Sequence, residues 1–147
     1  WRVAGPQFEA LRAALPPGMR AVGGIGNGVF EISEDLVGFQ QLAYLQADDP
    51  ELFADVYARI GDLMLSLWTT FLERYADSFA ICRFGDDLGF KTGTLISREH
   101  LCEYILPWNQ RFAELAHAHG RPFLLHCCGN VHFRVGNFHR KQGRRQS

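Results

Sequence analysis

The sequence lacks the features of a membrane-spanning or secreted protein. None of its 147 residues belongs to an apolar run near the roughly 18 to 20 residues that a helix needs to cross a bilayer. No charged and then apolar leader opens the chain, so no signal peptide is predicted. Cysteine is scarce, and its four residues lack the spacing of a small disulfide-stapled domain. We therefore expect a cytoplasmic protein without membrane partners, whose thiols are free or bind a metal.

Acidic residues are missing from the last part of the chain. The whole sequence is nearly neutral, with 15 Lys and Arg against 16 Asp and Glu. Residues 132–147 contain five basic residues and no acidic one, which leaves ten basic against sixteen acidic residues upstream. The segment also lacks apolar periodicity, so we predict a globular domain over residues 1–131 and a disordered or non-native basic tail. Nucleic-acid binding by this tail is the less favoured interpretation.

Short apolar runs alternate with long amphipathic ones in the rest of the chain. Residues 20–30 predict a strand that leads into a glycine-rich loop, and residues 78–84 predict a second strand. A third strand is predicted over 123–125, with His126 at its carboxyl end. The stretches between them carry apolar residues three and four positions apart, which indicates helices. This order favours an α/β fold with parallel strands and helical crossovers.

Capping residues predict where the helices begin. Ser33 is expected to cap a first helix, because carboxylates that suit the helix dipole follow it directly. Asp49 followed by Pro50 predicts the start of a second and much longer helix. Ser97 is expected to cap a third helix, which Pro107 should kink or divide.

Polar residues gather after the first two predicted strands, where parallel α/β folds bind ligands. The loop 23–28 is rich in glycine but lacks the Lys and Ser/Thr of a phosphate loop, so close packing or ligand approach explains it better. Asp86 and Asp87 are candidate catalytic residues, because their mutual repulsion can raise one pKa enough for acid chemistry. Alternatively, one of them caps a helix or binds a backbone amide. Lys91 and Thr92 are candidates for binding an anionic substrate group, or are simply solvated.

An imidazole and a thiol follow the third predicted strand. His126 and Cys128 are two residues apart, so in an extended segment their side chains leave the same face and can bind one metal ion. Zinc accepts both donors but needs three or four ligands, and no CxxC or HxxxH pattern lies nearby. The alternatives are a hydrogen-bonded histidine beside a space-filling cysteine, and a Cys–His nucleophilic pair.

Three segments form a distinctive combination: Phe84–Ser97, a helix with Ile105-Leu106-Pro107-Trp108, and Pro122–Asn130. Together they resemble the uroporphyrinogen decarboxylase-like superfamily over about residues 20–131. That resemblance implies a partial (β/α)8 TIM barrel, about half of one, with parallel strands and long crossover helices. The superfamily contains porphyrinogen decarboxylases and methyltransferases that pass methyl groups between corrinoid proteins and thiols.

His126-Cys127-Cys128 matches the His-x-Cys zinc motif of the methyltransferases. The resemblance therefore implies that His126 and Cys128 bind zinc, that a third, cysteine ligand lies beyond this chain, and that Asp86 or Asp87 orients a small-molecule substrate or shuttles a proton. Zinc would hold a substrate thiol as thiolate near neutral pH. A corrinoid protein would donate the methyl group, and a homodimer is the implied assembly.

Two alternatives stand beside methyl transfer. A true uroporphyrinogen decarboxylase, a carboxy-lyase of porphyrin biosynthesis, would use no metal or cofactor. Its N-terminal arginine-rich motif is not found in this sequence, and Asp87 would repel a substrate carboxylate. Because the chain opens at Trp1 rather than Met, we also consider an inactive truncated fragment with unpaired strand edges. We expect the full-length enzyme to perform zinc-assisted methyl transfer.

Overall fold

The computed structural model describes residue 2 and residues 4–131. The predicted basic tail, residues 132–147, lies outside these described residues. The elements follow one another as α1 (Ala4–Ala14), β1 (Ala21–Gly23), α2 (Val29–Val37), α3 (Phe39–Asp48), α4 (Pro50–Tyr75), the 3-10 turn η1 (Ala76–Ser78), β2 (Phe79–Gly85), α5 (Arg98–His100), the π-helical turn η2 (Leu101–Ile105), α6 (Leu106–Ala118) and β3 (Phe123–His126).

The strands form one open parallel sheet in the order β1–β2–β3. Ala21 of β1 pairs with Phe79 of β2, and Gly85 at the end of β2 pairs with His126 at the end of β3. Helices separate consecutive strands, so the predicted parallel α/β arrangement is confirmed. Because β2 and β3 end in register, the loops that follow them leave the sheet side by side.

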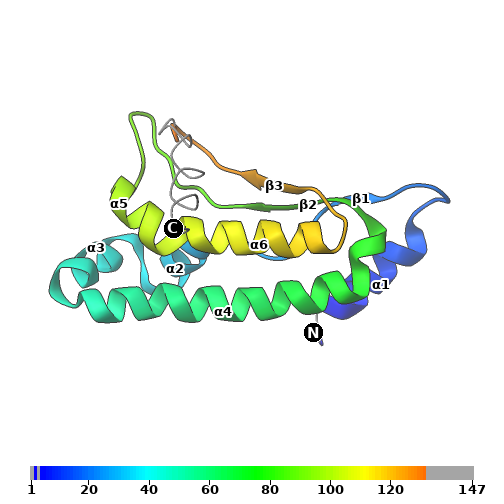
Figure 1. Ribbon diagram of the computed structural model, residues 1–147, viewed down its shortest axis with the longest axis horizontal. Coiled ribbons are helices and arrows are strands. Elements are labelled where there is room, and N and C mark those ends of the chain that lie inside the picture. The colour runs from blue at the N-terminus through cyan, green and yellow to red at the C-terminus, as the bar shows by residue number, and fades with distance from the viewer. Residues whose placement is uncertain (1, 3, 132–147) are drawn as a thin grey trace, which may run out of the picture.

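Helices α4 and α6 lie side by side along one face of the sheet (Figure 1). The core fills the space between them and the strands. The ring of Trp68 lies 5.9 Å from that of Phe84 in β2 and 6.4 Å from that of Phe112 in α6. A Cβ at Gly61 of α4 would overlap the ring of Trp108 in α6, so the close approach of the two helices requires glycine there.

The opposite face of the sheet carries exposed side chains. Val22 is 58% exposed and Leu124 is 49% exposed, and Arg83 is also exposed. Within residues 4–131 the helices that flank the sheet thus cover one face only (Figure 1). This is consistent with part of an α/β fold.

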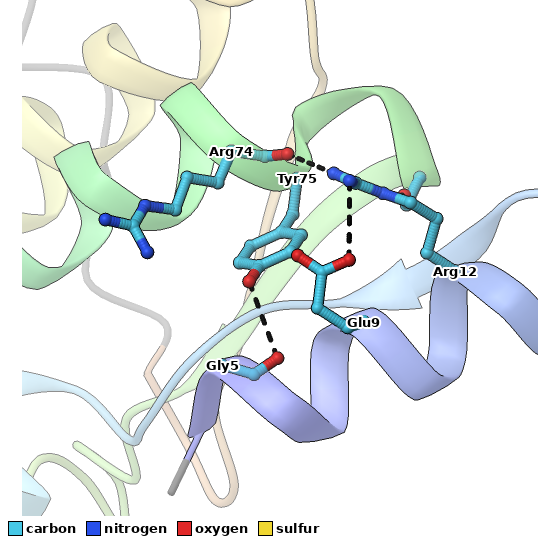
Figure 2. A network of polar contacts seen from close by, with 6 residues as sticks. Gly5, Glu9, Arg12, Arg74 and Tyr75 are labelled. Atoms are coloured by element: carbon cyan, nitrogen blue, oxygen red, sulfur yellow. Dashed lines mark hydrogen bonds and ion pairs between the residues drawn. The ribbon is translucent and has the colours of Figure 1, made fainter. Parts of the chain in front are cut away.

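A polar network fastens α1 to the end of α4 (Figure 2). The Arg12 guanidinium donates to the backbone carbonyl of Arg74, lies 3.6 Å from the Glu9 carboxylate, and stands 5.0 Å over the Tyr75 ring. The Tyr75 hydroxyl in turn donates to the carbonyl of Gly5 at 3.4 Å. These contacts hold α1 near the amino end of β2, opposite the edge that carries the predicted site residues.

Three helix boundaries agree with the sequence prediction. The Asp49 side chain accepts a hydrogen bond from the Leu52 amide at 3.0 Å and so caps α4. Ser97 accepts from the His100 amide at 3.2 Å and caps α5. Pro107 divides the third helix, since α6 begins beside it after the turn η2. None of the helices in the described part of the chain has the length and hydropathy that crossing a membrane requires.

The prediction that Ser33 caps the first helix is wrong. The helix begins earlier, at Val29, and Ser33 is buried inside it, where its hydroxyl donates to the Phe30 carbonyl at 2.6 Å. The cap comes instead from Asp86, which accepts from the backbone amides of α2. Gly38, with a φ of 93°, then separates α2 from α3.

Candidate metal centre

His126 and Cys128 lie together at the carboxyl end of β3. The ring Nε2 of His126 is 3.3 Å from the Sγ of Cys128, and both residues are exposed. Cys127 between them is half-buried, and its Sγ accepts a hydrogen bond from the Leu88 amide at 3.2 Å. The alternation of the chain therefore presents Cys128, and not Cys127, beside the imidazole.

Asp87 joins this pair from the neighbouring loop. Its carboxylate accepts a hydrogen bond from the Cys128 amide at 2.8 Å. One carboxylate oxygen of Asp87, one ring nitrogen of His126 and the Sγ of Cys128 all lie within 4.8 Å of one another. Nitrogen and sulfur ligands on a tetrahedral zinc are about 3.5 Å apart, given bonds of roughly 2.0 and 2.3 Å, and the distance of 3.3 Å between His126 Nε2 and Cys128 Sγ is close to this value.

The charges of this cluster favour a cation. The Cys128 amide bond lowers the pKa of Asp87, so this carboxylate is ionised at neutral pH. The hydrogen bond with Asp87 is the largest cause of the raised pKa of the Cys128 thiol, and the negative charge of Asp87 adds to it. A metal ion binding here therefore has to displace the thiol proton, and its affinity should rise with pH.

Asp86 has a different position from its neighbour. It is fully buried and accepts hydrogen bonds from the amides of Glu31 at 3.0 Å and Phe30 at 3.5 Å. Burial raises its pKa to about 7, although these two amides oppose the shift. A Cβ at Gly28 would overlap the Asp86 side chain, so glycine is required before the helix. Asp86 thus anchors α2, which was the alternative predicted for one of the paired carboxylates.

Glu31 also lies at this edge, and the sequence analysis missed it. Its Oε2 is 3.8 Å from the point that a Cβ on Gly85 would occupy, and the His126 Cδ2 is 3.7 Å from the same point. Burial raises the pKa of Glu31, and Asp87 and Asp35 raise it further, while His126 opposes them. The signal was present in the sequence as an acidic first turn, but placing the helix start at Ser33 put Glu31 outside the helix.

Lys91 and Thr92 are exposed in the loop that follows β2. The loop rests on the segment after β3 through a bridge between Phe90 and Asn130, whose amide donates to the Phe90 carbonyl at 2.7 Å. Among the described residues, no hydrogen bond or ion pair joins Lys91 or Thr92 to the Asp87, His126 and Cys128 cluster. The loop thus places them near the sheet edge without fixing their side chains.

The glycine-rich loop after β1 serves packing. A Cβ at Gly24 would overlap the ring of Trp68, and Gly26 has a φ of 66°. A separate apolar cavity of about 200 Å³ is lined by Phe30, Leu42 and Phe53 among others, and none of the cluster residues borders it. The metal-binding candidates therefore sit on an open edge of the sheet.

Comparisons of the chain with known protein families, with curated proteins and with solved structures found no match. The resemblance to the uroporphyrinogen decarboxylase-like superfamily therefore stays a prediction. The interpretation of the site rests on its own geometry.

Proposed function

We propose that Asp87, His126 and Cys128 bind one zinc ion and that the full-length protein uses it to transfer a methyl group to a thiol. One observation carries the proposal: three different donors from the carboxyl ends of two paired strands and the residues just after them lie within 4.8 Å of one another. Three protein donors are typical of catalytic zinc sites, which keep a position for a substrate.

Each residue has a defined part in this proposal. His126 and Cys128 supply the nitrogen and sulfur ligands, and Asp87 supplies an oxygen while its bond to the Cys128 amide orients the chain between them. Zinc, when bound, would lower the pKa of a substrate thiol so that it is a nucleophile at neutral pH. Asp86 accepts the Glu31 amide and so positions α2, and because Asp87 is the next residue, the same contact holds the start of the loop that carries Asp87.

The wider proposal follows the resemblance described above. A parallel sheet with crossover helices on one face and its candidate site at the carboxyl edge supports a partial (β/α)8 barrel. A corrinoid protein is the proposed methyl donor. Porphyrinogen decarboxylation gains less support, because Glu31 and Asp87 place negative charge where an acidic tetrapyrrole would need cations.

Zinc binding can be measured on the 147-residue chain by titration against a competing chelator and by metal analysis after dialysis. We expect one zinc per chain. The substitutions Asp87→Asn, His126→Ala and Cys128→Ser should each weaken zinc affinity by more than roughly tenfold, because even the loss of a residue that only hydrogen-bonds to a metal ligand costs about tenfold or more. Cys102→Ser, which removes an exposed thiol outside the cluster, should leave it unchanged. Equal and negligible zinc in all five proteins would contradict the proposal and favour the decarboxylase or inactive-fragment alternatives.

A further inference from the structure

Gly85, the last residue of β2, lies beside the proposed zinc site and carries no side chain between the His126 ring and the Glu31 carboxylate. Gly85 pairs with His126, and the point where its Cβ would stand lies 3.7 Å from the His126 ring and 3.8 Å from the Glu31 carboxylate. The next atom, the His126 carbonyl oxygen, is 4.0 Å away. Because Gly85 has no side chain, a small group can bind over its Cα in contact with the His126 ring and the Glu31 carboxylate.

Negative charge gathers around Gly85, and the His126 imidazole is the group that opposes it at Glu31. Burial raises the pKa of both Glu31 and Glu34, and the carboxylates of Asp35 and Asp87 raise both values further. The ion pairs Arg12–Glu9, Arg59–Asp55, Arg111–Asp62 and Arg121–Asp77 do not involve these carboxylates. A cationic group bound between these carboxylates would relieve their repulsion.

The backbone of Glu31 is fixed by a hydrogen bond to Asp86. Its backbone amide donates to the buried Asp86 at 3.0 Å, in the first turn of α2, so the helix fixes where its side chain starts. Glu34 lies one turn further along the same helix, and none of its atoms is among the three nearest to the Cβ point of Gly85. Glu31 and Glu34 therefore lie in the same helix and are both acidic, but Glu31 is the one whose carboxylate is among the nearest groups to Gly85.

We propose that Glu31 is a specificity-determining residue that selects thiol substrates with a neighbouring ammonium group. The sulfur binds at the Asp87, His126 and Cys128 cluster, and the ammonium group rests over Gly85 against the Glu31 carboxylate. The substrate class is thus a short aminothiol with its two groups a few bonds apart. This inference rests on the proposed zinc site.

The test uses the 147-residue chain loaded with Co²⁺, and the increase in thiolate charge-transfer absorption above that of the Cys128 ligand reports binding of a second sulfur. The probes are 2-aminoethanethiol and the neutral 2-mercaptoethanol, and the quantity compared is the ratio of their dissociation constants in each protein. Differences in thiol acidity cancel when this ratio is compared between variants. We expect Glu31→Gln to reduce the preference for the aminothiol about tenfold, as loss of one charged contact does. The matched variant Glu34→Gln should retain most of it.

Two results would overturn the inference while leaving the metal site intact. The first is normal Co²⁺ uptake with a ratio of dissociation constants that Glu31→Gln leaves unchanged. The second is an equal change of this ratio in Glu34→Gln, which would indicate that the general negative charge of the region, and not a contact with Glu31, favours the ammonium group. Co²⁺ uptake by each variant also reports that its site has folded. Failure of the wild-type chain to bind either Co²⁺ or Zn²⁺ would overturn the proposed function and this inference with it.

Discussion

Replacing Asp86 by Asn should change how the stability of this protein depends on pH. The pKa of the buried carboxyl is raised from 3.8 to about 7, so the folded chain keeps this proton to higher pH than the unfolded chain does. The free energy of unfolding therefore falls as the pH rises from about 4 to about 7. At 1.36 kcal/mol per pH unit the whole shift is worth about 4 kcal/mol, of which about 2.5 kcal/mol falls between pH 5 and pH 8.

Asparagine does not ionise, yet its side-chain oxygen can still accept the hydrogen bond from the Glu31 amide. The wild type should therefore lose about 2.5 kcal/mol relative to Asp86→Asn between pH 5 and pH 8. With a urea dependence of about 2 kcal/mol per molar, the two midpoints should separate by about 1 M over this range. The unfolding of both proteins can be followed by the fluorescence of the buried Trp68, with chelator present so that no metal contributes.

Asp87→Asn is the matched control. The pKa of Asp87 is lowered, so its stabilising contribution is complete above its unfolded pKa of 3.8 and is lost only as the pH falls through the lower folded value. This variant should therefore keep the wild-type slope between pH 5 and pH 8. If the wild-type and Asp86→Asn midpoints stay equally far apart at both pH values, the assignment of a buried, proton-retaining anchor is wrong.

Two further substitutions test the packing that positions the site. Gly61→Ala should destabilise the protein by about 1 to 3 kcal/mol in urea unfolding, because the new Cβ would overlap the Trp108 ring, whereas alanine at an uncrowded helix position would stabilise the protein. The control Gly93→Ala lies in open space and should be nearly neutral. A stabilised Gly61→Ala variant would refute the close contact between α4 and α6. Asp49→Ala should cost about 1 kcal/mol in thermal or urea unfolding, because the Leu52 amide loses its cap, and no measurable loss would show that Asp49 does not cap α4.

Local signals allowed much of the fold to be predicted from the sequence. Asp49 and Ser97 cap helices through amides only three residues away, and each could be recognised from its immediate neighbours. The start of α2 could not, because its cap comes from Asp86, 55 residues from Glu31 along the chain. A residue pattern within one segment carries no information about a cap supplied by a residue in a distant loop.

The candidate site was predicted in separate pieces for the same reason. Asp87 and the pair His126 and Cys128 were each placed after a strand, but only the register of β2 against β3 brings them within reach of one ion. The family resemblance implied a third, cysteine ligand outside the chain, whereas the structure places the Asp87 carboxylate beside the other two donors. Glu31 was missed because its helix was predicted to begin too late.

Asp86 and Asp87 are consecutive residues, so one peptide bond links the residue that caps α2 to the residue that contacts the candidate metal site. Asp86 holds the first turn of α2, and Asp87 reaches the open edge through the Cys128 amide. A motion that withdraws Asp87 from a bound ion also pulls on the anchor of the helix. Local opening of α2 would therefore speed the escape of the proposed zinc, and the lifetime of the bound ion would depend on the stability of this helix as well as on the metal–ligand bonds.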